Sequence, residues 1–507
     1  MATKPALPDF DGTLAGLVNL VQKGGLPVCT HSARVEPGSV FVCLPPALPA
    51  HKQEGAPGSE QFLPQVMEKE PLAVVLPESA AHLAARYGNT ATRFVLCPSP
   101  RKALGMLASA FCGTDRLCPK AIAVTGTNGK TTETYLLEHI LAQKGQSVGI
   151  MGTVEYRWPG HHEESSLTTP GCLELHGLLG TMRDAGVDTV VMEVSSHAID
   201  QERVAGVDFA AALFTNLTQD HLDYHAGFED YFATKSRLFA PVSAGGLPLD
   251  GKAGACNADD PWCRRLLEQY PQYIGYGLDP ANRAPGARHL SGTLVSMSPE
   301  GMRLAMEFEG QKWEIASHLV GGFNASNLLG AQALGLAMGL MPADFACLAE
   351  FYGVPGRLER IANPCGLSLF VDYAHTPDAL VKAQTALRQA GFARIITVFG
   401  CGGNRDNTKR PLMGKAVAEH ADVAVLTSDN PRKEDPEAIM DMVMPGLAGC
   451  AEVHREGDRR KALALGLSLL GPGDALLVAG KGHEPYQIIG ETKYPFSDQA
   501  ILQELAR

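Results

Sequence analysis

Seven consecutive residues have the types and spacing of a phosphate-binding loop: Gly126-Thr127-Asn128-Gly129-Lys130-Thr131-Thr132. They follow an apolar stretch at 121–124 that predicts a strand, and they precede 133–144, where leucine and isoleucine recur at helical spacing. Glycines let backbone N–H groups approach phosphates, the helix N-terminus adds partial positive charge, lysine reaches the terminal phosphates and a hydroxyl can ligate Mg2+. The alternative is a plain glycine-rich turn, but Lys130 and Thr131 stand where phosphate chemistry needs them.

Two further polar groups follow predicted strands in the same region. Glu193, in Glu193-Val194-Ser195-Ser196-His197, ends the stretch 189–194 and could bind Mg2+ or orient a water molecule. His221 lies in a dense run, Asp220-His221-Leu222-Asp223-Tyr224-His225, which allows metal binding or proton transfer. The alternatives are a helix-capping acid for Glu193 and a polar surface loop for His221.

Lys235 stands on an otherwise apolar helix face. Tyr231 and Phe239 lie four residues before and after it, and Phe232 and Leu238 share the face. Such a lysine usually extends its amine to water. In a desolvated pocket the amine would instead be partly neutral and nucleophilic, and it could add CO2 to become a metal-binding carbamate.

Four polar clusters follow four predicted strands in the last third of the chain. They begin at Asp372, Gly400, Ser428 and Gly480. Strand ends at one edge of an open α/β sheet are where ligands bind, so four independent solvent loops are a poorer explanation. Within these clusters Arg405 and Arg432 could grip a carboxylate and Glu484 could accept an ammonium group, which together suit a zwitterionic amino acid.

The elements that must position these residues form an alternating strand and helix pattern. We expect an α/β protein of three domains: a small mixed α/β domain at 1–100, a central phosphate-loop domain with a parallel sheet at 101–350, and a Rossmann-like domain at 351–507. The stretch 246–311 is rich in glycine and proline, and we expect antiparallel strands there. The predicted strands are 39–44, 72–76, 93–96, 121–124, 148–151, 189–194, 211–214, 369–372, 395–399, 423–427 and 475–479.

Composition limits the class of protein. The 507 residues are 45% apolar and carry a net charge of −12, so there is no overall basic footprint for nucleic acid. Twelve cysteines without paired spacing favour reduced thiols, and neither an apolar leader at the N-terminus nor a run of about 20 apolar residues is present. We expect a cytoplasmic monomer that acts on small molecules, without a nucleic-acid or membrane partner.

Taken together, these motifs resemble the Mur ligase family, and more narrowly its MurE type, over almost the whole chain. The short G-x-x-G-K-T-T loop departs from the general phosphate loop and matches the form in Mur ligases and folylpolyglutamate synthases. Similar signatures are Thr168-Thr169-Pro170, the runs that contain Glu193 and His221, and Tyr373-Ala374-His375-Thr376-Pro377. The run Asp429-Asn430-Pro431-Arg432 resembles enzymes that add meso-diaminopimelate, whose second carboxylate Arg432 would match; lysine-adding relatives typically lack this arginine.

The resemblance implies an ATP-dependent amide ligation through an acyl phosphate, with Mg2+ as cofactor and ATP as co-substrate. UDP-MurNAc-L-Ala-D-Glu would be extended by meso-diaminopimelate for peptidoglycan synthesis. Lys130, Glu193, His221 and Lys235 would be catalytic, and the metal ligands would be Thr131, Glu193, His221 and carbamylated Lys235. The nucleotide would contact the loop Gly126–Thr132 and three more residues, Asn324, Arg357 and Asp372.

The two other substrates would have their own residues. The resemblance assigns to the UDP-MurNAc-dipeptide Ser32, Arg34, Thr168, Thr169, Ser195 and Arg203. It assigns to diaminopimelate Arg405, Asp429, Asn430, Arg432, Gly480 and Glu484. The segment 45–61 has more proline, glycine and glutamate than the short link usual in the family. This departure concerns the assignment of the uridine-binding residues.

Several alternatives stay open. One is another ligase of the same superfamily: a lysine-adding MurE, a MurF-type enzyme or a folylpolyglutamate synthase. Another is a nucleotide-binding scaffold that has lost turnover, which would have broken metal ligands. Helicases and transporter ATPases should show a full-length phosphate loop with a basic stripe or a membrane segment.

Overall fold

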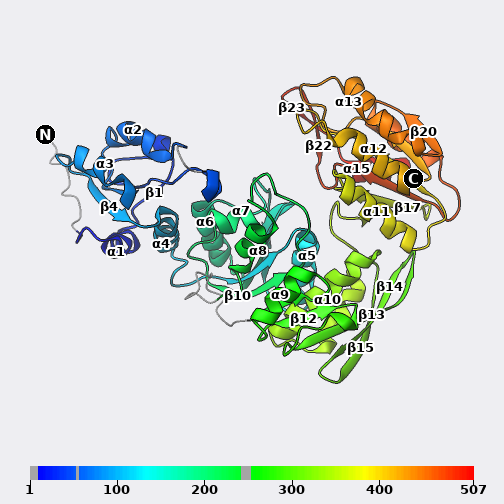
Figure 1. The fold of residues 1–507 in the computed structure, drawn as a ribbon, viewed down its shortest axis with the longest axis horizontal. Helices are drawn as coiled ribbons and strands as arrows, with labels where there is room; N and C mark the ends of the chain where they lie inside the picture. Colours follow the sequence, from blue (N-terminus) through cyan, green and yellow to red (C-terminus); the bar gives the residue numbers. More distant parts are fainter. Residues whose placement is uncertain (1–9, 53–55, 241–252) are drawn as a thin grey trace. The chain divides into compact units, whose positions relative to one another are not determined.

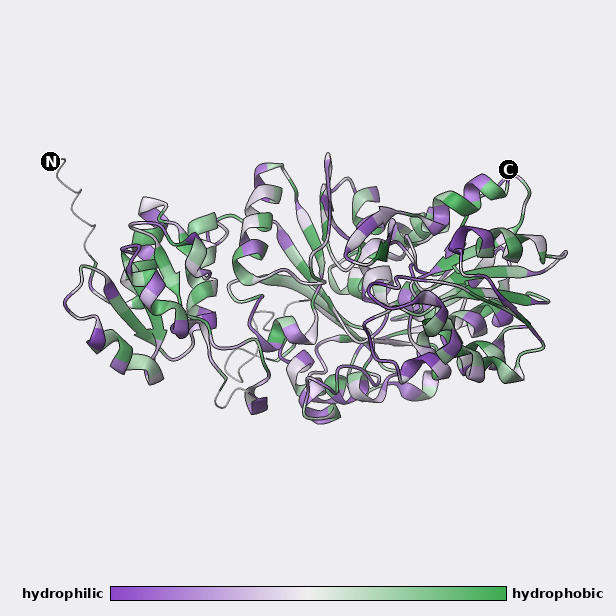
Figure 2. Cartoon of the chain, turned by 90° about the horizontal axis from the view of Figure 1, so that it is seen from above, coloured by the Kyte–Doolittle hydropathy of each residue, from purple (hydrophilic) through white to green (hydrophobic). Residues whose placement is uncertain are grey.

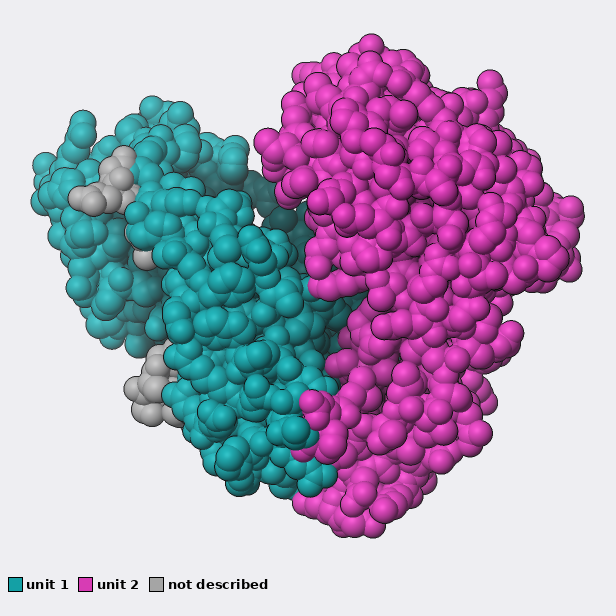
Figure 3. Space-filling model, turned by 45° about the vertical axis from the view of Figure 1, so that its right-hand side comes forward, with its two compact units in different colours: residues 1–276, 281–289, 333–340 teal, residues 277–280, 290–332, 341–507 magenta. Residues whose placement is uncertain are grey.

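The computed structural model describes residues 10–52, 56–240 and 253–507 (Figure 1). The chain divides into two compact units, coloured separately in Figure 3. The first comprises Met1–Tyr276, Ala281–His289 and Ala333–Leu340, and the second comprises Gly277–Pro280, Leu290–Gln332 and Met341–Arg507.

The first unit begins with a four-stranded sheet in the order β1-β2-β3-β4, and every pairing in it is parallel. Apolar residues from α1 and α4 pack against one face of this sheet. The strands and these two helices are β1 (Val28–Cys29), β2 (Val40–Val42), β3 (Ala73–Pro77), β4 (Arg93–Cys97), α1 (Leu14–Gly24) and α4 (Pro100–Cys112).

A larger sheet of the first unit follows the order β12-β11-β10-β5-β9-β6-β7-β8. Its central pairs, β10 with β5, β5 with β9 and β9 with β6, are parallel, whereas β7 and β8 form an antiparallel edge that the sequence did not predict. The strands are β5 (Lys120–Thr125), β6 (Val148–Met151), β7 (Glu155–Trp158), β8 (His161–Glu164), β9 (Thr189–Glu193), β10 (Phe209–Phe214), β11 (Ala253–Asn257) and β12 (Ile274–Gly277).

Helices cover the large sheet. One face packs against apolar residues of four helices, while α5 contacts β5, β6 and β9. These helices are α5 (Lys130–Gln143), α6 (Cys172–Asp184), α7 (Ser196–Asp200), α8 (Phe228–Ser236) and α9 (Pro261–Gln269).

The expectation of antiparallel strands throughout 246–311 is wrong for part of that stretch, and its first residues, up to 252, lie outside the described residues. Strand β11 pairs in parallel with β10, and β12 pairs in parallel with β11. Gly254 makes this packing possible, because a Cβ there would lie 2.4 Å from Tyr273 Cδ1. The next three strands do pair in antiparallel fashion: β13 (His289–Ser298) with β14 (Gly301–Phe308), and β14 with β15 (Gln311–Ser317).

The second unit contains a six-stranded sheet in the order β16-β17-β21-β18-β19-β20. The pairings from β17 to β20 are parallel, and apolar side chains cover both faces. Figure 2 colours the strands of this sheet as mostly hydrophobic. The strands are β16 (Glu359–Arg360), β17 (Ser368–Asp372), β18 (Ile395–Phe399), β19 (Val423–Leu426), β20 (Glu452–Arg455) and β21 (Ala475–Ala479).

Helices α11, α12 and α13 pack on one face of this sheet, and α14 and α15 pack on the other. This is the doubly wound α/β arrangement that the strand and helix rhythm predicted. The helices, with the preceding α10, are α10 (Gly322–Ala337), α11 (Pro377–Gln389), α12 (Lys409–His420), α13 (Pro436–Val443), α14 (Arg459–Ser468) and α15 (Asp498–Leu505). A small antiparallel pair, β22 (Tyr486–Ile489) and β23 (Thr492–Pro495), lies between β21 and α15 in the chain.

Among the described residues, no helix is both long and apolar enough to cross a bilayer. All twelve cysteines have free thiols.

Two glycines in the middle of helices of the first unit allow a test of the packing. Gly105 in α4 meets the chain at Ala205, and a Cβ there would lie 2.6 Å from the Ala205 carbonyl carbon and oxygen. We expect Gly105→Ala to lower the free energy of unfolding by about 1–3 kcal/mol, because the helix must move to relieve the overlap. Thermal unfolding followed by circular dichroism measures this as a lower midpoint.

Gly177 in α6 is the matched control, since a Cβ there meets nothing within 4 Å. We expect Gly177→Ala to raise the midpoint, because alanine favours helix by up to about 1 kcal/mol over glycine. Equal midpoints for the two variants would contradict the close approach of α4 to Ala205.

Candidate active site

The phosphate loop of the first unit joins β5 to α5 in a conformation that needs glycine. Gly126 has φ +143° and Gly129 has φ +87°, both outside the range that side-chain-bearing residues adopt readily. A Cβ at Gly126 would lie 1.9 Å from Thr215 Oγ1. The loop therefore packs directly against the chain that follows β10, and its N–H groups are used there: Thr127 N donates to Asn216 O and Asn128 N to Asn216 Oδ1, each at 2.9 Å.

Two lysine amines converge on one backbone oxygen of this loop. Lys130 Nζ donates to Gly126 O at 3.1 Å and to Thr127 O at 2.8 Å. Lys235 Nζ donates to the same Gly126 O at 2.9 Å and to Thr125 Oγ1 at 3.3 Å. The structure thus brings together two residues that are 105 positions apart in the sequence.

Lys235, in the last turn of α8, does not extend its amine to water, because the residue is buried with only 1% exposure. Burial, reinforced by the nearby Lys130 charge, holds the pKa of Lys235 well below its usual range. The amine also lies 4.9 Å from the centre of the Tyr231 ring, whose hydroxyl lies 3.1 Å from Thr127 Oγ1. Sequence reasoning treated Tyr231 only as an apolar residue, and no local signal marked its hydroxyl.

Glu193 ends β9 beside the phosphate loop and is 1% exposed. Its Oε1 accepts a hydrogen bond from Thr153 N at 2.8 Å, and its Oε2 accepts one from Thr153 Oγ1 at 3.0 Å. The carboxylate is therefore held by the loop that follows β6, the neighbouring parallel strand. Thr131, in the first turn of α5, is also buried.

His221 belongs to an aromatic cluster after β10. Its backbone is left-handed, with φ +53°, and its ring lies edge-on to His197 at a centroid distance of 4.8 Å. Burial lowers the pKa of His221, which favours the neutral imidazole that can donate a lone pair. Burial and the neighbouring His221 lower the pKa of His197 to about 4.

The donor atoms of this site limit which metal ions it could hold. Within the described ranges, no group of three or more His, Cys, Asp or Glu side chains is arranged to hold a metal ion. The hydroxyl of Thr131 and the carboxylate of Glu193 are the oxygen donors that Mg2+ prefers. A second ion at His221 and Lys235 fits only if the amine carries an added carboxylate, because an ammonium group has no lone pair.

Predicted substrate-binding residues gather around Glu193. Thr169 Oγ1 donates to Glu193 O at 2.8 Å and accepts from Ser195 N at 3.1 Å. Arg203 Nη1 donates to Thr169 O at 3.3 Å. The Thr168 hydroxyl lies 3.0 Å from Thr153 Oγ1, beside the Glu193 carboxylate.

A cavity of about 650 Å³ in the first unit contains two of the residues predicted for the UDP-sugar, Arg34 and Arg203. Ser32 does not line it; its hydroxyl lies 3.5 Å from Gln65 Oε1. Arg101 also lines the cavity. Sequence reasoning missed it, because its position at the start of α4 carries no motif. Its guanidinium donates to the carbonyls of Gln201 at 2.9 Å and Pro46 at 2.9 Å.

The second unit has its own cavity, of about 440 Å³, at the carboxyl edge of the six-stranded sheet. Four polar clusters meet there because the strands that precede them, β17, β21, β18 and β19, are neighbours in that order. All six residues predicted to bind diaminopimelate line it: Arg405, Asp429, Asn430, Arg432, Gly480 and Glu484.

Backbone geometry aims these residues into the cavity. Arg432 has a left-handed backbone, φ +52°, and its Nη1 donates to Gly403 O at 2.9 Å. Asp429 Oδ2 is buried and has no hydrogen-bond partner among the described residues. Gly480 is required beside it, because a Cβ there would lie 2.6 Å from this oxygen.

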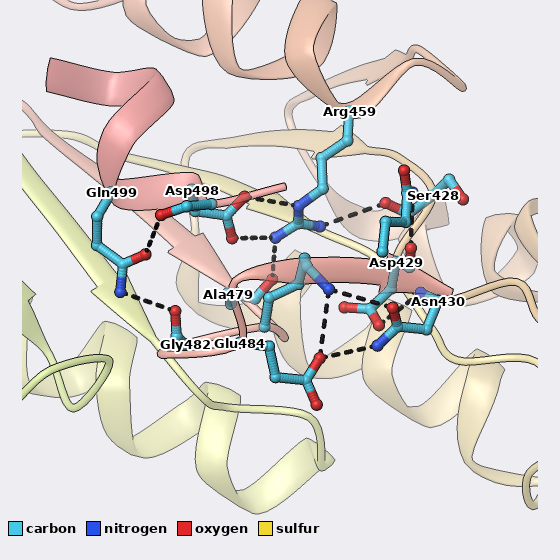
Figure 4. A network of polar contacts seen from close by, with 12 residues as sticks. Ser428, Asp429, Asn430, Arg459, Ala479, Gly482, Glu484, Asp498 and Gln499 are labelled. Atoms are coloured by element: carbon cyan, nitrogen blue, oxygen red, sulfur yellow. Dashed lines mark hydrogen bonds and ion pairs between the residues drawn. The ribbon is translucent and has the colours of Figure 1, made fainter. Parts of the chain in front are cut away.

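Asn430 and Glu484 are joined across the cavity wall (Figure 4). Asn430 Nδ2 donates to Glu484 Oε2 at 2.8 Å, and Lys481 Nζ lies between the two side chains. Sequence reasoning did not single out Lys481, although it stands in the same short run as Gly480 and Glu484.

The three remaining predicted nucleotide residues, Asn324, Arg357 and Asp372, belong to the second unit, whereas the phosphate loop belongs to the first. Asp372 Oδ2 accepts from Leu358 N at 2.6 Å, and burial raises the pKa of this carboxyl. Asn324 Nδ2 donates to Val320 O at 2.9 Å. The Arg357 guanidinium lies 5.1 Å from the centre of the Tyr373 ring.

Comparisons with known proteins agree with these features. Residues 124–335 match the Mur ligase middle domain, and residues 356–482 match the Mur ligase glutamate ligase domain. A UDP-N-acetylmuramoyl-L-alanyl-D-glutamate–2,6-diaminopimelate ligase of Lawsonia intracellularis is 48% identical over 492 residues, which is 97% of this chain and 98% of that protein. A ligase of the same name from Gloeobacter violaceus is 41% identical over 98% of this chain and 94% of that protein.

Solved structures show the same relationship. A structure of a ligase with this name is 29% identical, with a TM-score of 0.65, over 95% of this chain and 94% of that one. The MurF ligase of Thermotoga maritima, solved with ADP, is 16% identical with a TM-score of 0.57, over 95% of this chain and 97% of that one, and shows the same fold. The identity to curated relatives over nearly the full length and the two matched domains lead to one conclusion: this chain belongs to the Mur ligase family.

Proposed function

We propose that the protein is an ATP-dependent ligase that adds meso-2,6-diaminopimelate to UDP-MurNAc-L-Ala-D-Glu, a cytoplasmic step of peptidoglycan precursor synthesis. One observation carries the choice of amino acid. The residues that line the cavity of the second unit include the guanidinium groups of Arg405 and Arg432 and the carboxylates of Asp429 and Glu484. This set suits an amino acid that carries both a carboxylate and an ammonium group at the end that does not form the new amide bond.

The proposed reaction activates a carboxylate and then transfers it to an amine. The D-glutamate carboxylate attacks the γ-phosphorus of ATP and ADP leaves; the amine of diaminopimelate then attacks the acyl carbon and phosphate leaves. In this proposal Lys130 binds the β- and γ-phosphates, which is the role of the lysine in a phosphate loop. Positioning and charge stabilisation supply most of the catalysis in phosphoryl transfer of this kind.

In this proposal Thr131 and Glu193 hold one Mg2+, and His221 and Lys235 hold a second. When bound, the two ions would offset the negative charges of the phosphates and the incoming carboxylate. The depressed pKa of Lys235 supports its modification, because a neutral amine can add CO2 and release a proton to give a carbamate. The modified side chain would carry a negative charge beside Lys130, where the unmodified ammonium would be repelled.

The remaining roles are assigned to match the substrates. Thr168, Thr169, Ser195 and Arg203 hold the MurNAc-dipeptide near Glu193, and Ser32 and Arg34 face the uridine nucleotide. Asn324, Arg357 and Asp372 are assigned to the nucleotide, as the family resemblance implies. We propose a division of labour among domains 1–100 for the UDP-sugar, 101–350 for ATP and 351–507 for the amino acid.

The first test measures ADP release by the purified protein with ATP, Mg2+ and UDP-MurNAc-L-Ala-D-Glu. We expect turnover with meso-diaminopimelate and none with L-lysine, because lysine lacks the second carboxylate that Arg432 would bind. Turnover with lysine alone would support ligase activity but reject diaminopimelate as the amino acid. No ADP release with either amino acid would reject ligase activity on this acceptor.

Arg432 can be tested separately. We expect Arg432→Ala to raise the KM for diaminopimelate by about 10- to 100-fold, the equivalent of the roughly 1.5–3 kcal/mol that charge-assisted hydrogen bonds contribute. The KM of Arg432→Lys should lie between those of the wild type and Arg432→Ala, since lysine keeps the charge and loses the two-pronged geometry. The matched control is Lys433→Ala, which should leave the KM unchanged, because the exposed Lys433 amine pairs with the exposed carboxylate of Glu491.

Lys235 tests the proposed metal site. We expect Lys235→Ala to lower kcat by at least about 100-fold, the loss typical of removing one stabilising group at a transition state. Added formate or acetate should restore part of the activity, because a small carboxylate can enter the space that the carbamate would fill. Lys235→Arg, which cannot be modified and leaves no space, should not respond, and a response to acetate in that variant would argue against the carbamate.

A further inference from the structure

A buried ion pair lies behind the cavity of the second unit. Arg459 begins α14 and Asp498 begins α15, and both side chains have 0% exposure. Arg459 Nε donates to Asp498 Oδ1 at 2.9 Å and Nη2 donates to Oδ2 at 2.7 Å, a two-pronged contact shown in Figure 4. Neither residue lines the cavity. Because an apolar pair of similar volume is often at least as stable, fold stability alone does not explain the buried charges.

Arg459 also donates hydrogen bonds at the ends of the two strands, β21 and β19, whose following loops line the cavity. Nη2 donates to Ala479 O at 3.0 Å, and Nη1 donates to Ser428 O at 3.4 Å. Ala479 is the last residue of β21, and Ser428 follows β19 closely. The next residues along the chain, Gly480 and Asp429, line the cavity. One guanidinium therefore fixes the points at which two cavity loops leave the sheet.

The residue after Asp498 holds one of these loops further along. Gln499 Nε2 donates to Gly482 O at 2.9 Å and to Glu359 Oε2 at 3.2 Å. The loop from Gly480 to Glu484 is thus fixed at its start by Arg459 and at its middle by Gln499.

The two fixed loops meet through Lys481, whose side chain has 0% exposure. Its amine donates to Asn430 Oδ1 at 3.2 Å and to Glu484 Oε2 at 3.3 Å. Glu484 Oε2 therefore accepts from two protein donors, whereas Oε1 has no hydrogen-bond partner within the described part of the chain. Glu484 also lines the cavity. The direction of this free oxygen depends on where the two loops are held.

We propose that the first two residues of α15 set the geometry of the amino-acid cavity. Asp498 orients Arg459, and Arg459 and Gln499 hold the loops that carry Asn430 and Glu484. These three are positioning residues, because they act through the loops and do not touch the amino acid. The inference rests on the proposed function, in which this cavity binds diaminopimelate. Misplacement of a binding group by about 1 Å can cost up to roughly 100-fold in rate.

The test uses the full-length chain with Gln499→Ala and Asp498→Asn. We expect each variant to raise the KM for meso-diaminopimelate about tenfold or more while the KM values for ATP and UDP-MurNAc-L-Ala-D-Glu stay at the wild-type value. Since Asp498→Asn leaves the Arg459 charge unbalanced in the interior and can unfold the domain, the half-buried Gln499→Ala carries the test. The control is Glu504→Ala on the same helix, whose exposed carboxylate pairs with exposed Arg460.

Two outcomes for Gln499→Ala overturn the inference, with thermal unfolding used to verify that the variant is folded. One is an unchanged KM for diaminopimelate. The other is an equal loss for all three substrates, which a purely structural role would produce. Wild-type protein that does not use diaminopimelate would overturn the proposed function and this inference with it, whereas wild-type turnover with unaffected variants would overturn only the positioning role.

Discussion

Removal of cationic side chains from water is the physical constraint on which both sites depend. A charged amine or guanidinium is costly to bury unless carbonyl or carboxylate oxygens replace its hydration. Lys235 meets this condition only partly, with one carbonyl and one hydroxyl as partners, and burial lowers its pKa. Arg459 meets it fully, with a carboxylate and two carbonyls. The first arrangement favours a reactive amine, and the second favours a fixed guanidinium.

Parallel sheets supply the oxygens and the geometry for these arrangements. In both units, residues at the carboxyl ends of neighbouring strands fall on one edge, where loops of different strands can share a side chain. Glu193 at the end of β9 is held by Thr153 after β6, and Asn430 after β19 is held to Glu484 after β21. Each binding group therefore depends on a strand other than its own, which makes its position a property of the sheet.

This organisation explains what the sequence could predict. The doubly wound fold is confirmed, and the predicted strands at 148–151, 395–399 and 475–479 coincide with β6, β18 and β21, because buried parallel strands are short apolar runs with clear ends. The gathering of four polar clusters at one edge followed from the same rule. Helical spacing placed Lys235 on an apolar face but left two outcomes open, an amine extended to water or a desolvated amine, and the buried side chain shows the second.

Contacts between distant segments were beyond such reasoning. The pairing of Arg459 with Asp498 spans 39 positions, and α15 carries no motif that connects it to the cavity. Strands β11 and β12 were expected to be antiparallel, because glycine and proline in their segment hid a buried parallel pair whose close packing requires Gly254.

Two of the proposed site residues have a strained backbone. His221 and Arg432 both adopt left-handed backbone conformations that cost residues other than glycine about 1–3 kcal/mol, and nothing in their residue types announces this. Both stand one loop beyond a buried parallel strand, β10 for His221 and β19 for Arg432, and both project a polar side chain that the proposed chemistry uses. A sheet that fixes the loop ends on either side can sustain such a conformation, because the surrounding packing exceeds the local cost. The packing of the sheets thus determines how these single side chains are oriented. Sequence spacing reveals which residues are available but not which way they point.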